Sequence, residues 1–142
     1  MHFMALATEY DGTIAHDGNV AADTLASLKR LKESGRRLVL VTGREVPDLK
    51  RVFPELGLFD KIVAENGALI YSRASEEEKA VSPPPSPEFV RALKKRGVKP
   101  LSAGRSIVAT WEPYQSSCLE VINELGLELE IIFNKGAVIV LP

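Results

Sequence analysis

The stretch Ala5-Leu6-Ala7-Thr8-Glu9-Tyr10-Asp11-Gly12-Thr13 decides how this chain folds. The apolar run from Phe3 to Ala7 predicts a brief buried strand, and Asp11-Gly12 predicts a turn just after it. Two carboxylates, Glu9 and Asp11, follow that run one residue apart. Because open α/β sheets place ligands at the carboxyl ends of their strands, we expect this strand to begin such a sheet and to carry polar groups at its rim.

The composition predicts an ordinary globular protein with one modest core. The chain has 142 residues, 45% of them hydrophobic and 26% charged, which suits a packed interior. A net charge of −1 gives no electrostatic argument for nucleic acid or for an anionic membrane as a partner. The single cysteine, Cys118, cannot form an internal disulfide, and no apolar run approaches the roughly 18 residues of a membrane span. We therefore expect a cytoplasmic protein.

Strands and helices alternate along the first part of the sequence. Residues 14 to 20 are expected to form a polar loop, and Asn66-Gly67 is expected to form a two-residue hairpin turn. The remaining predicted elements are a helix from Ala21 to Ser34, a strand from Arg37 to Val41, a helix from Val46 to Phe53, and strands from Lys61 to Ala64 and from Ala68 to Tyr71. This alternation predicts an α/β fold with a partial, Rossmann-like parallel sheet.

A change in amino-acid composition marks the start of a second lobe. Residues 72–80 are strongly charged and residues 81–87 contain four prolines, so we expect the core to occupy 1–80 and a linker to occupy 81–87. The lobe from 88 to 142 is expected to be a small α+β unit with a partly antiparallel sheet. Its predicted elements are helices from Pro87 to Arg96 and Ser116 to Leu125, with strands from Ser106 to Thr110, Leu129 to Phe133 and Ala137 to Leu141.

Polar motifs follow three successive predicted strands of the first lobe: Glu9 with Asp11, Thr42-Gly43-Arg44, and Asn66-Gly67. Each motif alone is better explained as an ordinary strand end or turn. In a parallel sheet, however, these ends share one rim. Carboxylates are suitable ligands for Mg²⁺, and a threonine hydroxyl, a glycine amide and an arginine suit a phosphate. Together the motifs predict phosphoryl chemistry, with attack by one carboxylate and acid–base catalysis by the other.

These motifs resemble the haloacid dehalogenase-like superfamily, in its Cof-type phosphatase branch. That branch carries Asp-x-Asp-Gly-Thr, then Thr/Ser-Gly-Arg, then Asn-Gly-Ala, and here the order is Glu9-Tyr10-Asp11-Gly12-Thr13, Thr42-Gly43-Arg44 and Asn66-Gly67-Ala68. The resemblance implies that Asp11 is the general acid and base and offers its main-chain carbonyl to Mg²⁺. It also implies that Thr42 holds the phosphoryl group, that Thr13, Gly43, Arg44 and Asn66 line the site, and that the second lobe is a cap over the substrate.

Two departures from the family pattern change the expectation. Glu9 stands where the family has its nucleophilic aspartate, so its carboxylate reaches one methylene further while remaining able to ligate the metal. The family's later lysine and acidic motif, which follow the cap, are not found in this sequence. We therefore expect a Mg²⁺-dependent phosphatase of a small phosphorylated metabolite, impaired or incomplete in this chain.

The alternative is a catalytically silent binding module that needs a partner or a missing C-terminal part. A sheet edge left unpaired also predicts self-association, or a partner that completes the sheet. A dinucleotide-binding domain is excluded because the first strand-to-helix turn lacks the glycine pattern it requires.

Overall fold

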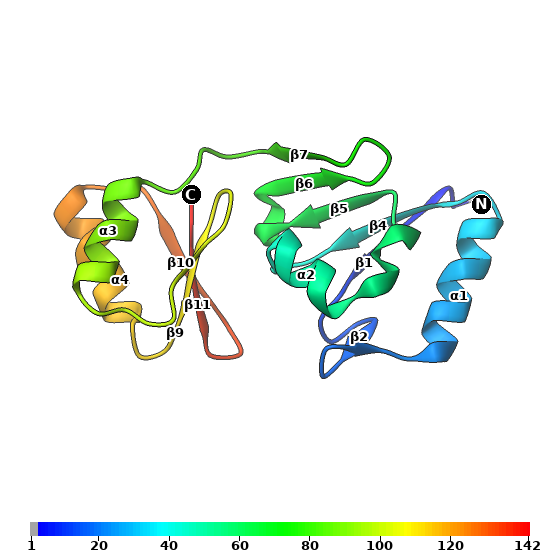
Figure 1. Cartoon of the computed structure of the whole chain (residues 1–142), viewed down its shortest axis with the longest axis horizontal. Helices are drawn as coiled ribbons and strands as arrows, with labels where there is room; N and C mark the ends of the chain where they lie inside the picture. Colours follow the sequence, from blue (N-terminus) through cyan, green and yellow to red (C-terminus); the bar gives the residue numbers. More distant parts are fainter. Residues whose placement is uncertain (1–2) are drawn as a thin grey trace. The chain divides into compact units, whose positions relative to one another are not determined.

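The computed structural model describes residues 3–142, and they form two compact units (Figure 1). The first unit ends at Lys79, and the second runs from Ala80 to Pro142. Within residues 3–142, none of the helices has the length and apolar character that crossing a bilayer requires.

The first unit is built on a five-stranded sheet with the order β1-β4-β5-β6-β7. Its strands are β1 (Ala5–Glu9), β4 (Arg37–Val41), β5 (Lys61–Ala64), β6 (Leu69–Ser72) and β7 (Glu77–Ala80). β1, β4 and β5 run parallel, and β6 returns antiparallel beside β5. The predicted α/β fold with a partial parallel sheet is therefore confirmed, and β1 is an outer strand of this sheet.

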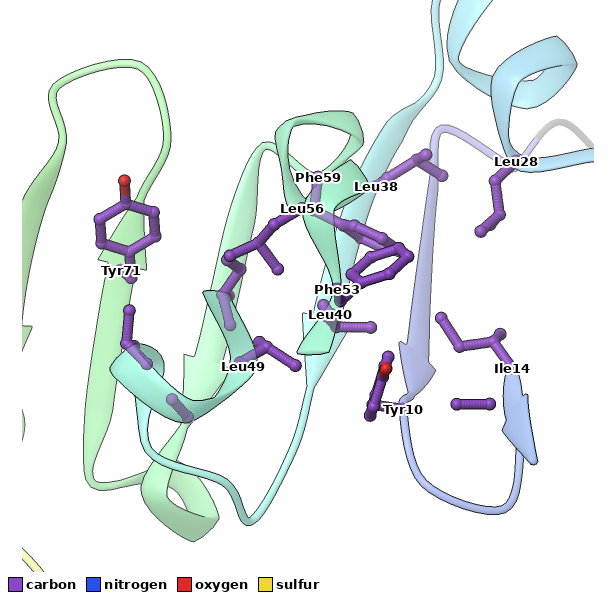
Figure 2. Packing of buried hydrophobic residues seen from close by; sticks show 14 of the residues in the cluster. Tyr10, Ile14, Leu28, Leu38, Leu40, Leu49, Phe53, Leu56, Phe59 and Tyr71 are labelled. Carbon is purple, nitrogen blue, oxygen red and sulfur yellow. The ribbon is translucent and has the colours of Figure 1, made fainter. Parts of the chain in front are cut away.

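Helices cover one face of this sheet. They are α1 (Ala22–Glu33), α2 (Val46–Val52) and the 3₁₀ helix η1 (Pro54–Leu58). Residues from all three helices pack in one cluster with Leu38 and Leu40, which are fully buried (Figure 2). The alternating residues Val39 and Val41 point to the opposite face and are only half-buried. The core of this unit therefore lies on a single side of its sheet.

The segment 14–20, expected to be a polar loop, is instead a short hairpin of β2 (Ala15–His16) and β3 (Asn19–Val20). The turn between them is Asp17-Gly18, where φ is +50° and +77°, the pair of values that a tight two-residue hairpin turn needs. The hydroxyl of Tyr10 donates a hydrogen bond of 3.0 Å to the carbonyl of Gly18 and fixes the turn to the core. The prediction of a loop was wrong because Asp17-Gly18 is a hairpin-turn signal and was treated as part of a loop.

The connection from β5 to β6 is a hairpin, but its turn is longer than expected. Ala64 pairs with Leu69, so four residues separate the strands rather than the two of an Asn-Gly turn. The 3₁₀ turn η2 (Glu65–Gly67) forms the loop, and φ is positive at both Glu65 (51°) and Asn66 (54°). This loop brings Asn66 to the rim of the sheet.

The charged stretch 72–80, which was expected to be irregular, ends in the outer strand β7. All four residues of β7 are exposed. A strand at the sheet edge tolerates charged side chains on both faces, and such charges discourage pairing with other chains. The amino-acid composition therefore did not predict β7, because this strand is held by main-chain hydrogen bonds and not by buried side chains.

The second unit has a four-stranded sheet with the order β10-β11-β9-β8, and all its neighbouring strands are antiparallel. Its elements are α3 (Pro87–Lys95), β8 (Ser102–Ala103), β9 (Val108–Trp111), α4 (Gln115–Leu125), β10 (Glu130–Asn134) and β11 (Ala137–Leu141). Both helices pack against the sheet around Phe89, Cys118 and Val138. The α+β expectation holds in outline, with a fully rather than partly antiparallel sheet.

Candidate active site

The rim of the first unit is organised by an ion pair between Asp11 and Arg44. Arg44 follows β4, and Asp11 follows β1. Arg44 Nε donates to Asp11 Oδ2 at 2.8 Å and Nη2 donates to Oδ1 at 2.9 Å, a two-point contact across 33 residues of sequence. The pair is partly exposed, with relative accessibilities of 28% and 29% for the two side chains. Planar pairing of this kind fixes orientation as well as charge.

A second carboxylate extends this pair. Asp48, in the first turn of α2, accepts a hydrogen bond of 2.6 Å from Arg44 Nη1 and one of 2.5 Å from Arg51 Nη2. The hydrogen bond to Asp11 raises the pKa of Arg44 further above its usual range, although burial opposes this. Burial acts to raise the pKa of Asp48, but the bonds from Arg51 and Arg44 outweigh it and lower that pKa. The Arg44 guanidinium and the Asp48 carboxylate thus favour their charged forms.

The loops after β4 and β5 are joined by main-chain hydrogen bonds. The amide of Asn66 donates to the Thr42 carbonyl at 3.3 Å, and the amide of Glu65 donates to the Arg44 carbonyl at 3.1 Å. The Asn66 side chain also lies close to the Gly43 main chain, because a Cβ atom at Gly43 would lie 3.0 Å from Asn66 Oδ1. Thr42 itself is 1% exposed, and its hydroxyl oxygen accepts from the Arg44 amide at 3.1 Å.

Two other predicted site residues lie at the end of β1. Glu9 is the last residue of this strand, opposite Val41 of β4, and it is exposed. Thr13 is exposed in the turn after Asp11, where its amide donates to the Tyr10 carbonyl at 3.4 Å. The structure thus joins Asp11, Thr42, Gly43, Arg44 and Asn66 through direct contacts and places Glu9 and Thr13 beside Asp11 along the chain. Their catalytic roles stay predictions.

Asp48, Glu65 and Tyr10 belong to this rim, although the sequence analysis assigned them no role. Asp48 follows Arg44 by four residues, the spacing at which helical side chains meet, and that signal was available. Glu65 is a carboxylate only 1% exposed, next to Asn66. The ring of Tyr10 is fully buried beneath the Arg44 guanidinium, whose carbon lies 5.6 Å from the ring centroid. Sequence spacing predicts neither the burial of Glu65 nor the contact of Tyr10 with Arg44.

The small number of available carboxylates at this rim limits which metal could bind there. Across residues 3–142, no group of three or more His, Cys, Asp or Glu side chains is arranged to hold an ion. Mg²⁺ needs fewer, because it commonly binds one or two carboxylates together with water and substrate phosphate. The exposed Glu9 carboxylate and the main-chain carbonyl of Asp11 are oxygen donors of that kind, while the Asp11 side chain is engaged by Arg44.

Comparison with known proteins identifies the family to which this chain belongs. The sequence profile of the haloacid dehalogenase-like hydrolases matches residues 6–105 of the chain. That match covers more than half of the sequence and includes every motif described above, so the chain belongs to the haloacid dehalogenase-like hydrolase family. The family includes the Cof-type phosphatases that the motifs resemble.

Relatives of known activity share part of the chain. The glucosyl-3-phosphoglycerate/mannosyl-3-phosphoglycerate phosphatase of Persephonella marina is 33% identical over 69 residues, 48% of this chain and 26% of its own length. The phosphoglycolate phosphatase of Metallosphaera sedula is 36% identical over 69 residues, 46% of this chain and 31% of its own. The matches thus span about a quarter to a third of these curated relatives.

A solved structure shows the same fold over nearly the whole chain. The haloacid dehalogenase-like hydrolase from Bacteroides thetaiotaomicron superposes with a TM-score of 0.72 at 16% identity. The superposition covers 99% of this chain and 71% of that one. At such low identity the likeness concerns the fold, and it extends through both units.

Proposed function

We propose that this chain is a Mg²⁺-dependent phosphatase that hydrolyses a small phosphorylated metabolite, with reduced activity because Glu9 occupies the nucleophile position. The observation that carries the proposal is the contact network at the carboxyl ends of β1, β4 and β5, where Asp11, Arg44, Thr42 and Asn66 meet. A ligand site is expected at such a rim. Both named relatives act on phosphate monoesters of small acids, which favours the same class of substrate.

The proposed reaction has two steps. In the first, a Glu9 carboxylate oxygen attacks phosphorus, the bond from phosphorus to the ester oxygen breaks, and Asp11 gives its proton to the departing alkoxide. In the second, water attacks phosphorus of the acyl phosphate while Asp11 takes a proton from that water. Inorganic phosphate leaves, and the Glu9 carboxylate is restored. Thr42, the Gly43 amide, Asn66 and Thr13 hold the phosphoryl oxygens throughout.

Glu9 explains why we expect weak turnover. Its carboxylate extends one methylene beyond that of an aspartate, and a displacement of about 1 Å in a reacting group can reduce the rate on the order of a hundredfold. The Glu9 carboxylate and the Asp11 main-chain carbonyl would hold Mg²⁺, which would neutralise phosphate charge when bound. We further propose that the second unit acts as the cap that recognises the rest of the substrate, and that the protein works in the reducing cytoplasm.

The second candidate is a silent binding module of the same fold. It is favoured by the position of β1, an outer strand whose second edge has no neighbour among the described strands. Such an edge would pair with a second copy or with a partner that completes the sheet. Under this alternative, the rim would bind phosphate or metal without turnover.

The test is Mg²⁺-dependent phosphate release from an aryl phosphate by the unaltered chain, Glu9→Asp and Glu9→Ala. All three are purified identically, so Glu9→Ala reports contaminating phosphatase. We expect slow release by the unaltered chain that EDTA abolishes, faster release by Glu9→Asp, and none above background by Glu9→Ala. If all three folded proteins release phosphate equally slowly, with or without EDTA, the proposal is wrong and the silent module stands.

A further inference from the structure

Arg44 is held from three sides, and this is unusual for a partly exposed arginine. Asp11 accepts from Nε and Nη2, Asp48 accepts from Nη1, and the buried ring of Tyr10 lies under the guanidinium. A free arginine side chain has many rotamers, and ordering one costs conformational entropy. Contacts on several edges of the plane limit the guanidinium to one orientation.

The two carboxylates that hold Arg44 differ in where they come from. Asp11 is 33 residues away along the chain, in the turn after β1, whereas Asp48 is four residues away on α2. α2 is fixed to the core through Val46 and Leu49, which are fully buried. α2 therefore anchors Asp48, which can fix the Arg44 guanidinium where it contacts Asp11.

Asp48 is itself oriented. Its Oδ1 accepts from Arg51 Nη2 at 2.5 Å while its Oδ2 accepts from Arg44 Nη1 at 2.6 Å, so each oxygen has its own cation. The order is Arg51, Asp48, Arg44, Asp11, with alternating charge and a net charge of zero. Each carboxylate oxygen of Asp11 accepts one hydrogen bond from Arg44 in this arrangement.

We propose that Asp48 is a positioning residue for Asp11, because it holds Arg44 in the orientation in which Arg44 contacts both oxygens of the Asp11 carboxylate. The proposal rests on the proposed function in one respect, the acid and base role of Asp11. In this proposal Asp48 acts through Arg44 and takes no direct part in the reaction. Its contribution to catalysis is to keep the Asp11 carboxylate in one plane, through Arg44.

The direct test is a nuclear magnetic resonance spectrum of the ¹⁵N-labelled chain, which reports the Nε proton of Arg44 without requiring turnover. Arg44→Lys identifies the signal by removing it. In Asp48→Ala we expect the signal to move toward those of exposed arginines and to exchange with water roughly tenfold faster, the factor that one charged hydrogen bond represents. Asp48→Asn keeps an acceptor oxygen and should restore part of the effect. An unchanged Arg44 signal in Asp48→Ala overturns the proposal.

Asp60→Asn is the matched control. Asp60 also pairs with an arginine of the first unit, Arg37, at 3.1 Å, but it lies outside the rim network. This variant should leave the Arg44 signal in place. Circular dichroism of each variant establishes that the fold is retained, and Asp48→Asn carries the test if Asp48→Ala does not fold.

Kinetics separate positioning from binding. In the most active Glu9 background, Asp48→Ala should lower kcat for phosphate release roughly ten- to a hundredfold, as expected for a misplaced catalytic group, with KM little changed. A raised KM with unchanged kcat would assign Asp48 to substrate binding and overturn the proposal. If no variant releases phosphate, the proposed function falls, and the Arg44 signal alone still decides whether Asp48 positions Asp11.

Discussion

Asn66 occupies the space that a side chain at Gly43 would need: a Cβ atom there would lie 3.0 Å from Asn66 Oδ1 and 3.4 Å from Nδ2. The two residues follow different strands, β4 and β5, and belong to the two motifs that the sequence placed at one rim. Their close approach shows why the residue after Thr42 is glycine. The backbone needs no special conformation there, so the requirement is one of space.

Gly43→Ala should therefore change activity more than stability. The new methyl group displaces only the exposed Asn66 side chain, so we expect the free energy of unfolding to change by less than about 1 kcal/mol. Phosphate release should fall several-fold, because the displaced amide lines the proposed phosphate site. Urea unfolding and the aryl phosphate assay measure the two effects. If displacement of Asn66 causes the loss, Asn66→Ala alone should lower release at least as much, and adding Gly43→Ala to it should lower release no further. A loss of several kcal/mol in stability would contradict this account.

Asp60 is predicted to stabilise the first unit. Burial disfavours the ionised carboxylate, but hydrogen bonds from Lys32, the Leu38 amide and Arg37 outweigh it and lower the pKa of Asp60 to about 2. Against an ordinary value of 3.8, this difference corresponds to about 2 kcal/mol of stability at neutral pH. Asp60→Asn should lose about that much in urea unfolding at pH 7.

The pH dependence of this loss is a separate prediction. Because the pKa of Asp60 is lower in the folded chain, its contribution is fully present above the ordinary value of 3.8 and declines as the pH falls toward about 2. The stability difference between the unaltered chain and Asp60→Asn should thus be constant from pH 7 to about 5 and shrink below pH 4. A difference that stays constant down to pH 2.5 would show that Asp60 acts through its shape and not its charge.

Two phenylalanines of the second unit offer a matched comparison. Phe89 on α3 is fully buried in the core of this unit, whereas Phe133 on β10 is 57% exposed. Phe89→Ala should lower the free energy of unfolding by about 3–5 kcal/mol, because it removes buried surface and leaves a cavity. Phe133→Ala should stay within about 1 kcal/mol. Equal effects of the two substitutions would contradict the assignment of Phe89 to the core.

The inner strands β4 and β5 of the first unit were predictable because their signals are local, whereas β1, expected to be buried, has mostly exposed residues. The bounds of β4 and β5 match the expected Arg37–Val41 and Lys61–Ala64, where apolar runs end at polar motifs. β7 was missed because an edge strand with four exposed residues carries no apolar pattern. The position of β7 depends on main-chain hydrogen bonds, which a pattern of apolar and polar side chains does not predict.

The candidate site, like the fold, was predictable only in part. Parallel topology was enough to bring Asp11, Thr42, Arg44 and Asn66 to one rim, because strand ends of a parallel sheet coincide. It did not predict that Arg44 would face two carboxylates, since a guanidinium on a long side chain selects its partners by three-dimensional distance. The motif residues of the rim were thus predictable, but Asp48, Glu65, Tyr10 and the pairing among the side chains were not predicted.

The open edge of β1 leads to the last prediction, self-association of the chain. β1 is an outer strand, and the exposed apolar side chains Phe3 (70%) and Met4 (73%) lie just before it. An apolar edge with free main-chain groups is a template for pairing with another copy. We expect light scattering to report a mass that rises with concentration over the micromolar range.

Ala7→Lys tests whether β1 makes that contact. Ala7 is an exposed residue in the middle of β1, and a lysine on an edge strand opposes pairing by charge and by the hydration of its ammonium group. The variant should stay monomeric at concentrations where the unaltered chain associates. Ala26→Lys places the same charge on an exposed position of α1 and should leave association unchanged. If both lysines abolish association equally, net charge and not the β1 edge governs it, and if the unaltered chain stays monomeric throughout, the edge is closed by something other than a second copy.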